Sequence, residues 1–464
     1  MRRSGLNTLV YLIAVVVFLI VSTYAVLYAT GYKIDWQALT IKKTGFMLIE
    51  TYPKGANIKI ADKTTDKTTP ETIKRLLPGN YHIELTKDSY HPWQGDIKVA
   101  SGLVTENRNI LLTLEDLKPT ILLDQPVTRL RANADNTKIA LLVEGKIYLW
   151  DVKNKQSVSI VDAALIRQQI KLRNTNEIAR GNLNLIGFAP DNQTILFIST
   201  TPSNQYYLTI DTTSGIIKLI ATGRNFIDWQ WWSNSELLYT QNNKLYLLNL
   251  TTNQPKLLLS EAAFGYHLQD NNLYAAVKTK AGDIAFTEID KSGTTKPLFN
   301  LPEASEYSFS KIKLGWLVTA TQGTIASLWL EEKANGISVL KNILPNIEPT
   351  ILWDDTYLIY LQDHQLMSLE WELLNKPDSQ PVKITSLYNS KLTHFSFDTI
   401  LYIQNQTLKS VDLTGKNKYD LLPIVLPENL IISEPQMSQL IFIDALGDHR
   451  LTEATLREKT TTFF

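Results

Sequence analysis

Residues 138–151 read KIALLVEGKIYLWD: an apolar strand, a short turn and a second apolar strand. This phrase returns along the rest of the chain, and after the second unit its starts recur about every 40 residues, the period of a four-stranded propeller blade. We therefore expect residues 117–464 to form a β-propeller of eight blades, or of seven if the terminal unit is incomplete. The other seven units start at Thr194, Glu236, Asn272, Gly315, Tyr357, Thr399 and Gln439.

The two ends of this repeating region are expected to meet. Residues 119–124, Pro-Thr-Ile-Leu-Leu-Asp, precede the first unit and can supply an outer strand to the last blade. Several units also resemble the WD40-like repeats of TolB-type propellers. Residues 188–197, FAPDNQTILF, are the closest copy, Trp232-Ser233 begins a looser one, and Trp150-Asp151 carries the dipeptide of the eukaryotic repeat. The resemblance implies the propeller fold and leaves its function open.

A smaller module of short alternating strands precedes the propeller. Residues 57–61, Asn-Ile-Lys-Ile-Ala, alternate polar and apolar side chains as a half-buried strand does. The stretch 45–114 resembles a PEGA domain, through Pro53-Lys-Gly-Ala56, Thr69-Pro70, residues 77–85 (LPGNYHIEL) and Tyr90-x-x-Trp93. That resemblance implies a small β-sandwich that serves as an accessory module without catalytic residues. We interpret Tyr81, Tyr90 and Trp93 as core and turn-packing residues.

The N-terminal region is apolar and long enough to cross a membrane. Residues 4–32 contain no charged side chain, and the 22 residues from Thr8 to Ala29 would span about 33 Å as a helix. A cleaved signal peptide would have a shorter apolar region and small residues at its end. We therefore predict a retained anchor. Arg2 and Arg3 favour a cytoplasmic N-terminus, whereas Lys33, Lys42 and Lys43 follow on the other flank, so charge alone does not decide the orientation. The resemblances of the two β modules favour a cytoplasmic N-terminus, which would leave these modules of a single-pass plasma membrane protein outside the cytoplasm.

These features predict an all-β chain apart from one transmembrane helix. Its expected parts are a cytoplasmic tip with the helix (1–32), a linker (33–44), a PEGA β-sandwich (45–114) and a propeller (117–464). The 464 residues carry 46 basic and 46 acidic side chains, so the chain has no electrostatic footprint for nucleic acid. It has no cysteine, which excludes thiol catalysis, zinc–thiolate sites and disulfides.

No motif in the sequence predicts a cofactor, a metal site or a catalytic centre. There is no Gly-x-Ser-x-Gly elbow, P-loop or His-Glu-x-x-His, and the six histidines are scattered. Catalytic carboxylates gathered in a propeller channel would be distant in sequence. A propeller enzyme that acts on envelope glycans therefore stays open as the alternative function.

Two clusters are candidate partner or glycan contacts. In residues 228–232, Asp-Trp-Gln-Trp-Trp, the indoles of Trp229 and Trp231 could stack on sugars or anchor a protein, although packing between blades is the commoner use of such residues. The connection after the first unit carries Arg167, Lys171 and Arg173. It reads as a short amphipathic helix facing an anionic polymer or surface, or else as a solvated insertion.

The function that these features favour is binding. We expect a non-enzymatic extracytoplasmic scaffold that is held in the membrane by residues 8–29, with the PEGA module as a stalk or cell-wall adaptor. The propeller would then present a platform to a cell-envelope protein or polysaccharide.

Overall fold

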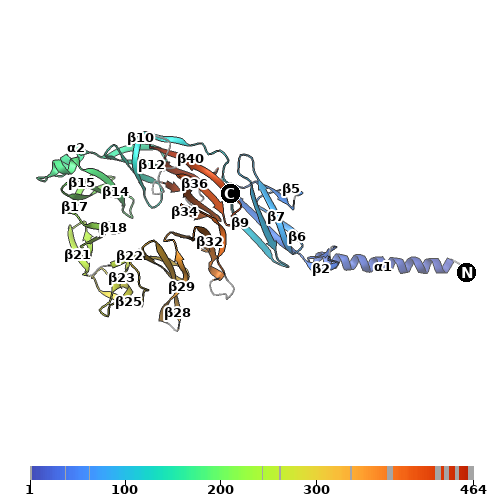
Figure 1. Ribbon diagram of the computed structural model, residues 1–464. Helices are drawn as coiled ribbons and strands as arrows, with labels where there is room; N and C mark the ends of the chain where they lie inside the picture. Colours follow the sequence, from blue (N-terminus) through green and yellow to red (C-terminus); the bar gives the residue numbers. More distant parts are fainter. Residues whose placement is uncertain are drawn as a thin grey trace.

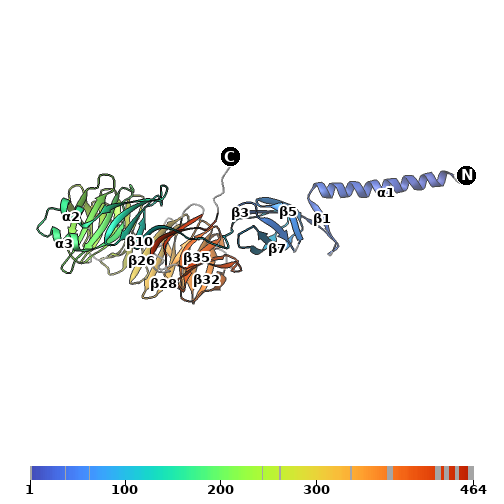
Figure 2. The same ribbon diagram turned by 90° about the horizontal axis from the view of Figure 1, so that it is seen from above.

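The computed structural model describes residues 3–36, 38–61, 63–242, 244–260, 263–334, 337–373, 380–423, 430–432, 438–444 and 449–457. Three parts follow one another along the chain (Figures 1 and 2). An isolated helix comes first, a small pair of β-sheets follows, and a large array of β-sheets takes up the remainder. The sandwich lies between the helix and the large array in both views.

The N-terminal helix α1 (Arg3–Ala29) has the length and composition of a membrane span over Val10–Ala29. Its described side chains are almost all exposed, as expected of an apolar helix whose solvent is lipid. The segment expected to be a linker instead folds as an antiparallel hairpin of β1 (Tyr32–Asp35) and β2 (Thr40–Lys43). Met1 and Arg2 lie outside the described residues.

The small module is a sandwich of two sheets, as predicted. One sheet has the order β6-β3-β9 and the other β5-β4-β7-β8. Strand β3 alternates buried and half-buried positions along its whole length, so Met47 and Ile49 point into a core that also contains Ile58 and Ile83. The strands are β3 (Gly45–Tyr52), β4 (Asn57–Ile60), β5 (Lys63–Thr68), β6 (Glu71–Leu76), β7 (Gly79–Thr86), β8 (Trp93–Val99) and β9 (Val104–Leu111).

The repeating region forms sheets in sequence order, each made of antiparallel neighbours. Six four-stranded sheets comprise β14–β17, β18–β21, β22–β25, β26–β29, β30–β33 and β34–β37, and a seventh sheet has the order β13-β12-β11-β10-β40-β39-β38. The strands of the first half are β10 (Thr120–Ala132), β11 (Lys138–Val143), β12 (Lys146–Asp151), β13 (Gln156–Val161), β14 (Asn182–Phe188), β15 (Thr194–Thr200), β16 (Gln205–Asp211), β17 (Ile217–Thr222), β18 (Phe226–Ser233), β19 (Glu236–Gln241), β20 (Lys244–Asn249), β21 (Gln254–Leu259), β22 (Ala263–Gln269), β23 (Asn272–Lys278), β24 (Ile284–Ile289) and β25 (Thr295–Asn300).

The second half adds strands of the same kind. They are β26 (Glu306–Ile312), β27 (Gly315–Gln322), β28 (Ile325–Ala334), β29 (Ile337–Ile347), β30 (Ile351–Trp353), β31 (Tyr357–Gln362), β32 (Gln365–Glu370), β33 (Val382–Ser386), β34 (Ser390–Ser396), β35 (Thr399–Gln404), β36 (Thr407–Asp412), β37 (Lys418–Pro423), β38 (Leu430–Ile432), β39 (Gln439–Ile443) and β40 (Arg450–Thr455). A short 3₁₀ turn, η1 (Trp371–Leu373), follows β32.

The seven-stranded sheet joins the two ends of the array. The first half of β10 pairs with β40, with Thr120 opposite Glu453, and its second half pairs with β11, with Leu130 opposite Leu141. The predicted outer strand from residues 119–124 is therefore confirmed. Separate apolar clusters pack each sheet on the next along the chain, and a further cluster unites β10 and β11 with β39 and β40. This is propeller packing; the number of blades stays a prediction.

Besides α1, the described residues contain two α-helices, both in the long connection between β13 and β14. They are α2 (Ala163–Gln169), whose N-terminus is capped by the Asp162 side chain, and α3 (Thr175–Arg180). Ile166 and Ile178 are buried in the cluster between the first two sheets. The connection is therefore packed on the propeller edge rather than extended into solvent.

Candidate functional site

The sandwich is joined to the propeller by a contact that we call the sandwich–propeller contact, made by Trp93 and Gln94 of β8 and by Asp412 and Asn417 around the β36–β37 turn. The indole nitrogen of Trp93 donates a hydrogen bond of 2.9 Å to the carboxylate of Asp412. The indole of Trp93 lies against Gly95, where a Cβ atom would come within 2.2 Å of the ring. A larger residue at position 95 would therefore displace the indole.

Asn417 pairs with the backbone of β8 as a neighbouring strand would. Its side-chain oxygen accepts from the Gln94 N–H at 3.0 Å, and its side-chain nitrogen donates to the Gln94 carbonyl at 2.9 Å. The same nitrogen lies 2.6 Å from the Asp412 carboxylate. Both Asn417 and Asp412 are buried. Because buried polar groups are costly when unpaired and favourable when paired, this arrangement specifies one docking position.

Aromatic and charged side chains extend the contact on either side. The rings of His91 and Tyr419 are stacked at 4.0 Å, and burial lowers the pKa of His91. At the outer edge, Lys416 reaches Asp96 of β8 at 2.5 Å. The contact therefore combines a buried polar centre with a charged rim, as stable protein interfaces do.

A second set of contacts fixes the other edge of the junction. The ring of Tyr52 lies 4.7 Å from that of Phe397, and the fully buried guanidinium of Arg457 lies 5.5 Å from the Tyr52 ring centre. The backbone N–H of Leu114 donates to the Leu456 carbonyl. The residues that follow β40 are thereby packed against the sandwich.

Beside this junction lies a cavity of about 810 Å³, which we call the inter-module groove. It opens between β9 of the sandwich and the turns at one end of three propeller sheets. Leu314 and Trp353 present exposed apolar surface there. Its lining is Asn109, Lys311, Ile312, Lys313, Leu314, Trp353, Asp354, Asp355, Thr356, Trp371, Glu372, Ser396 and Phe397.

Most of the carboxylates in and behind the groove form hydrogen bonds or ion pairs with neighbouring residues. Asp354 accepts hydrogen bonds from the backbone N–H groups of Thr356 and Tyr357, and Asp355 pairs with Lys313 at 2.5 Å. Asp398, in the turn between β34 and β35, differs. Burial, together with the charges of Asp354 and Asp412, raises its pKa to about 7. Among the described residues, no group of three or more His, Asp and Glu side chains is arranged to hold a metal ion.

The structure places Trp229 and Trp231 on β18, half-buried. Trp229 belongs to an aromatic cluster between two sheets, with ring-centre distances of 4.8 Å to Tyr207, 5.8 Å to Phe226 and 4.7 Å to Tyr239. Trp231 packs partly against the same cluster. The two indoles are therefore chiefly packing residues, and a ligand contact through their exposed parts stays a prediction.

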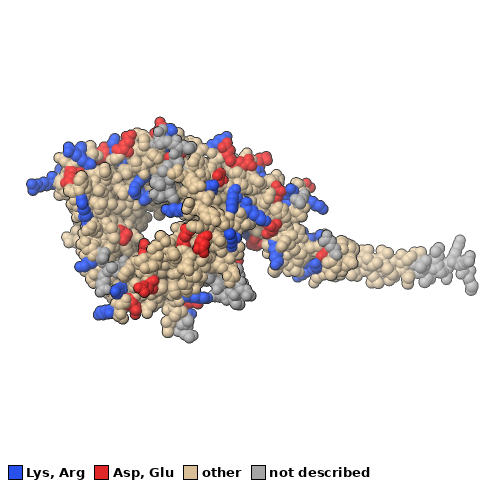
Figure 3. Space-filling model, viewed as in Figure 1, with Lys and Arg blue, Asp and Glu red and all other residues tan. Residues whose placement is uncertain are grey.

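Arg167, Lys171 and Arg173 are all exposed, on α2 and the turn that follows it. Basic side chains project at the left end of the molecule in Figure 3, over the position of α2 in Figure 1. Within the described ranges none of the three forms an ion pair. In Figure 1, α2 lies at the end of the propeller far from α1.

Sequence reasoning missed the sandwich–propeller contact and the groove. It assigned Trp93 to the sandwich core, and the side chain does belong to that core, but its polar edge faces the propeller. Its partner Asp412 is 319 residues further along the chain. The groove is formed by turns from several units, and no spacing within one unit indicates that they meet.

Comparison with known protein families identifies the small β module. Residues 44–116 match the family model of the PEGA domain, so this module is a PEGA domain. No curated protein matches the chain. Among solved structures, the Dos1 propeller is 12% identical, with a TM-score of 0.47 over 74% of this chain and 95% of that one.

Two further solved structures are similar to this chain. An oligogalacturonate lyase in complex with manganese is 10% identical, with a TM-score of 0.41 over 74% of this chain and 98% of that one. TolB from Acinetobacter baumannii is 15% identical, with a TM-score of 0.30 over 58% of this chain and 60% of that one. At these values the likeness concerns the fold and carries no activity over to this chain.

Proposed function

We propose that this chain is a non-enzymatic scaffold of the cell envelope, in which a membrane anchor and a rigid PEGA stalk hold a propeller at a set distance from the membrane. The observation that carries the proposal is that the PEGA domain is attached at both of its ends. At one end Trp93, Asp412 and Asn417 join it to the propeller. At the other end Arg75 joins it to α1, donating to the Tyr28 carbonyl at 2.9 Å.

These attachments favour a stalk over a cell-wall adaptor. In a flexible tether the modules would be joined by a polar linker with few contacts across it. Here the two modules share a buried carboxylate, a buried amide and stacked rings. The β8 edge of the PEGA domain is covered by the propeller, which leaves less of its surface for a wall polymer.

The inter-module groove is the proposed platform for a protein partner. Exposed apolar side chains flanked by both signs of charge are typical of protein-binding surfaces. Leu314 and Trp353 supply the apolar part, and Lys313 and Glu372 contribute the two charges. The face shown in Figure 3 carries interspersed acidic and basic side chains, which suits a folded partner better than a uniformly charged polymer.

A photo-cross-linking amino acid placed at Leu314 in intact cells tests the platform. Val158 is the matched control because it is also an exposed apolar residue, on β13 and outside the groove. We expect a discrete cross-linked protein from position 314 and none from position 158. Equal cross-linking from both positions, or from neither, would contradict a partner site in the groove.

The orientation of the anchor needs a separate test. The chain has no cysteine, so a single cysteine introduced at Asp66, an exposed position on β5 of the PEGA domain, can be labelled uniquely. With the N-terminus inside, a membrane-impermeant maleimide should label this site in spheroplasts before lysis. Labelling only after lysis would place the β modules in the cytoplasm.

A further inference from the structure

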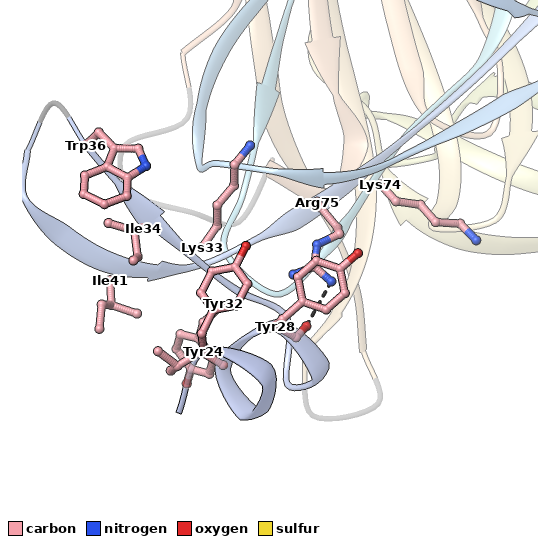
Figure 4. Close-up of a pocket in the computed structure, with 10 residues that line it drawn as sticks. Tyr24, Tyr28, Tyr32, Lys33, Ile34, Trp36, Ile41, Lys74 and Arg75 are labelled. Atoms are coloured by element: carbon pink, nitrogen blue, oxygen red, sulfur yellow. Dashed lines mark hydrogen bonds between the residues drawn. The ribbon is translucent and has the colours of Figure 1, made fainter. Parts of the chain in front are cut away.

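A cavity of about 410 Å³ lies where α1 meets the PEGA domain (Figure 4). Its walls come from the end of α1, from the β1–β2 hairpin that follows it, and from β6, which is distant in sequence. The lining residues are Tyr24, Leu27, Tyr28, Tyr32, Lys33, Ile34, Trp36, Ile41, Lys74 and Arg75. Three of them are basic and none is acidic, so the cavity favours an anion.

The position of the cavity relative to a bilayer follows from α1. The candidate span ends at Ala29, and with a rise of 1.5 Å per residue Tyr24 lies about 7 Å inside that end. Tyr24, Tyr28 and Tyr32 therefore form an aromatic belt at the level where tyrosine and tryptophan concentrate in membrane proteins. The cavity consequently opens at the boundary between hydrocarbon and headgroups.

The β1–β2 hairpin that follows α1 exposes apolar side chains. Trp36 is 76% exposed, Leu39 80% and Ile41 55%. Such exposure at a hairpin tip is unfavourable in water and favourable in a lipid interface. In Figure 4 the Trp36 indole and Ile41 lie on the hairpin, while the Lys33 ammonium points away from α1. The cavity therefore has both exposed apolar and basic side chains around it.

Arg75 shapes the inner wall. Its guanidinium lies 3.5 Å from the centre of the Tyr28 ring and donates to the Tyr28 carbonyl, at the C-terminal end of α1. It holds this position from a residue with φ +63°, a conformation that is uncommon for arginine. Lys33 and Lys74 make no ion pair within the described ranges, so their charges are available to a ligand.

We propose that this cavity binds an anionic phospholipid of the leaflet on the PEGA side of the membrane. Its phosphate would lie among Lys33, Lys74 and Arg75, and its acyl chains would lie along Tyr24, Leu27 and Ile41. The inference rests on the proposed membrane anchoring by α1 and names the lipid that the anchor contacts. Binding there would hold the PEGA domain upright on the membrane, because the lipid contacts both the helix and β6.

Native mass spectrometry of the full-length protein in detergent tests the headgroup preference. The probes are dioctanoylphosphatidylglycerol and dioctanoylphosphatidylcholine. We expect the phosphatidylglycerol probe to bind at least about tenfold more tightly than the phosphatidylcholine probe. In the Lys33→Gln/Lys74→Gln variant, the affinity for the phosphatidylglycerol probe should fall by about fivefold for each lysine removed. The matched control is Lys63→Gln/Lys98→Gln, two exposed lysines of the same domain outside the cavity. Equal affinity for the two lipids, or equal loss in both variants, would overturn the proposal.

Two further measurements separate the remaining outcomes. If glycerol 3-phosphate displaced the lipid at an equal concentration, the site would be one for free phosphates, and the lipid assignment would be wrong. A nitroxide at a cysteine replacing Phe18, in the middle of α1, reports the anchor itself in nanodiscs. If the nitroxide is accessible to oxygen, α1 lies in the bilayer, and an absent headgroup preference would then overturn only the lipid site. If the nitroxide is accessible to an aqueous quencher, the membrane anchoring is overturned as well.

Discussion

The replacement Asn417→Ala would remove the centre of the sandwich–propeller contact while leaving both modules folded. The lost side chain makes two hydrogen bonds to the Gln94 backbone and one to the Asp412 carboxylate. A neutral hydrogen bond contributes about 1 kcal/mol and one to a charged group about 1.5–3 kcal/mol. Since the groups left behind are buried, we expect the contact to weaken by about 3–5 kcal/mol.

Hydrogen exchange of the Gln94 backbone amide measures this loss directly, because Asn417 is its acceptor. Exchange of a protected amide follows the free energy of local opening, and about 1.4 kcal/mol corresponds to a factor of ten. We therefore expect the Gln94 amide to exchange at least about 100-fold faster in the variant. Amides in the middle of β3, inside the PEGA core, should keep their wild-type rates.

The matched control is Asn176→Ala, which removes the same side chain from an exposed position on α3. It should leave exchange at Gln94 unchanged. If Asn417→Ala also left that exchange at the wild-type rate, the amide would not be protected by this contact. The reasoning that makes the PEGA domain a rigid stalk would then fail.

Three other changes have defined outcomes. Asp398→Asn should flatten the pH dependence of Tm. The pKa of Asp398 is about 7 in the folded protein, above its unfolded value, so the stability of the wild-type protein falls as pH rises from about 4 to about 7. At pH 8 calorimetry should therefore find the variant more stable than the wild type by at most about 4 kcal/mol. Trp229→Leu should lower the free energy of unfolding by about 2–3 kcal/mol because it opens the aromatic cluster, whereas Trp353→Leu in the groove should leave stability nearly unchanged. Equal effects of the two replacements on Tm would contradict the packing role of Trp229. Replacing Arg167, Lys171 and Arg173 together by Gln should change the free energy of unfolding by less than about 1 kcal/mol but abolish any salt-sensitive co-sedimentation with cell-wall sacculi. If the variant still bound the sacculi, the α2 region would not be the source of that binding.

The order of the modules was predictable because short stretches of the sequence carry patterns typical of each module. Alternation with period two predicts strands such as β3 and β4, and the recurrence of one hairpin phrase predicts propeller sheets. The pairing of residues 119–124 with the last sheet was also predictable, since a propeller joins its ends. The hairpin at residues 32–43 was not, because each of its strands has only four residues and its exposed Trp36 and Leu39 disguise the alternation.

The candidate sites could be predicted only in part. Trp229 was identified as a notable residue, and it stacks between sheets from its place on β18, the first strand of a four-stranded sheet. The pairing of Trp93 with Asp412 depends on how two separately folded modules dock, and no local pattern encodes that distance of 319 residues. The raised pKa of Asp398 likewise depends on its burial and then on the charges of Asp354 and Asp412, neither of which can be predicted from composition.

The central claim is that the PEGA domain holds the propeller rigidly above the membrane. Because the chain has no cysteine, nitroxides can be attached at two introduced cysteines, one at Asp66 on the PEGA domain and one at Lys383 on β33 of the propeller, both exposed. Double electron–electron resonance on the full-length protein in nanodiscs then reports the distance between the modules. We predict a single narrow distribution whose centre matches the distance in the structure and which broadens in the Asn417→Ala variant. A broad or multiple distribution in the wild-type protein would contradict the rigid stalk.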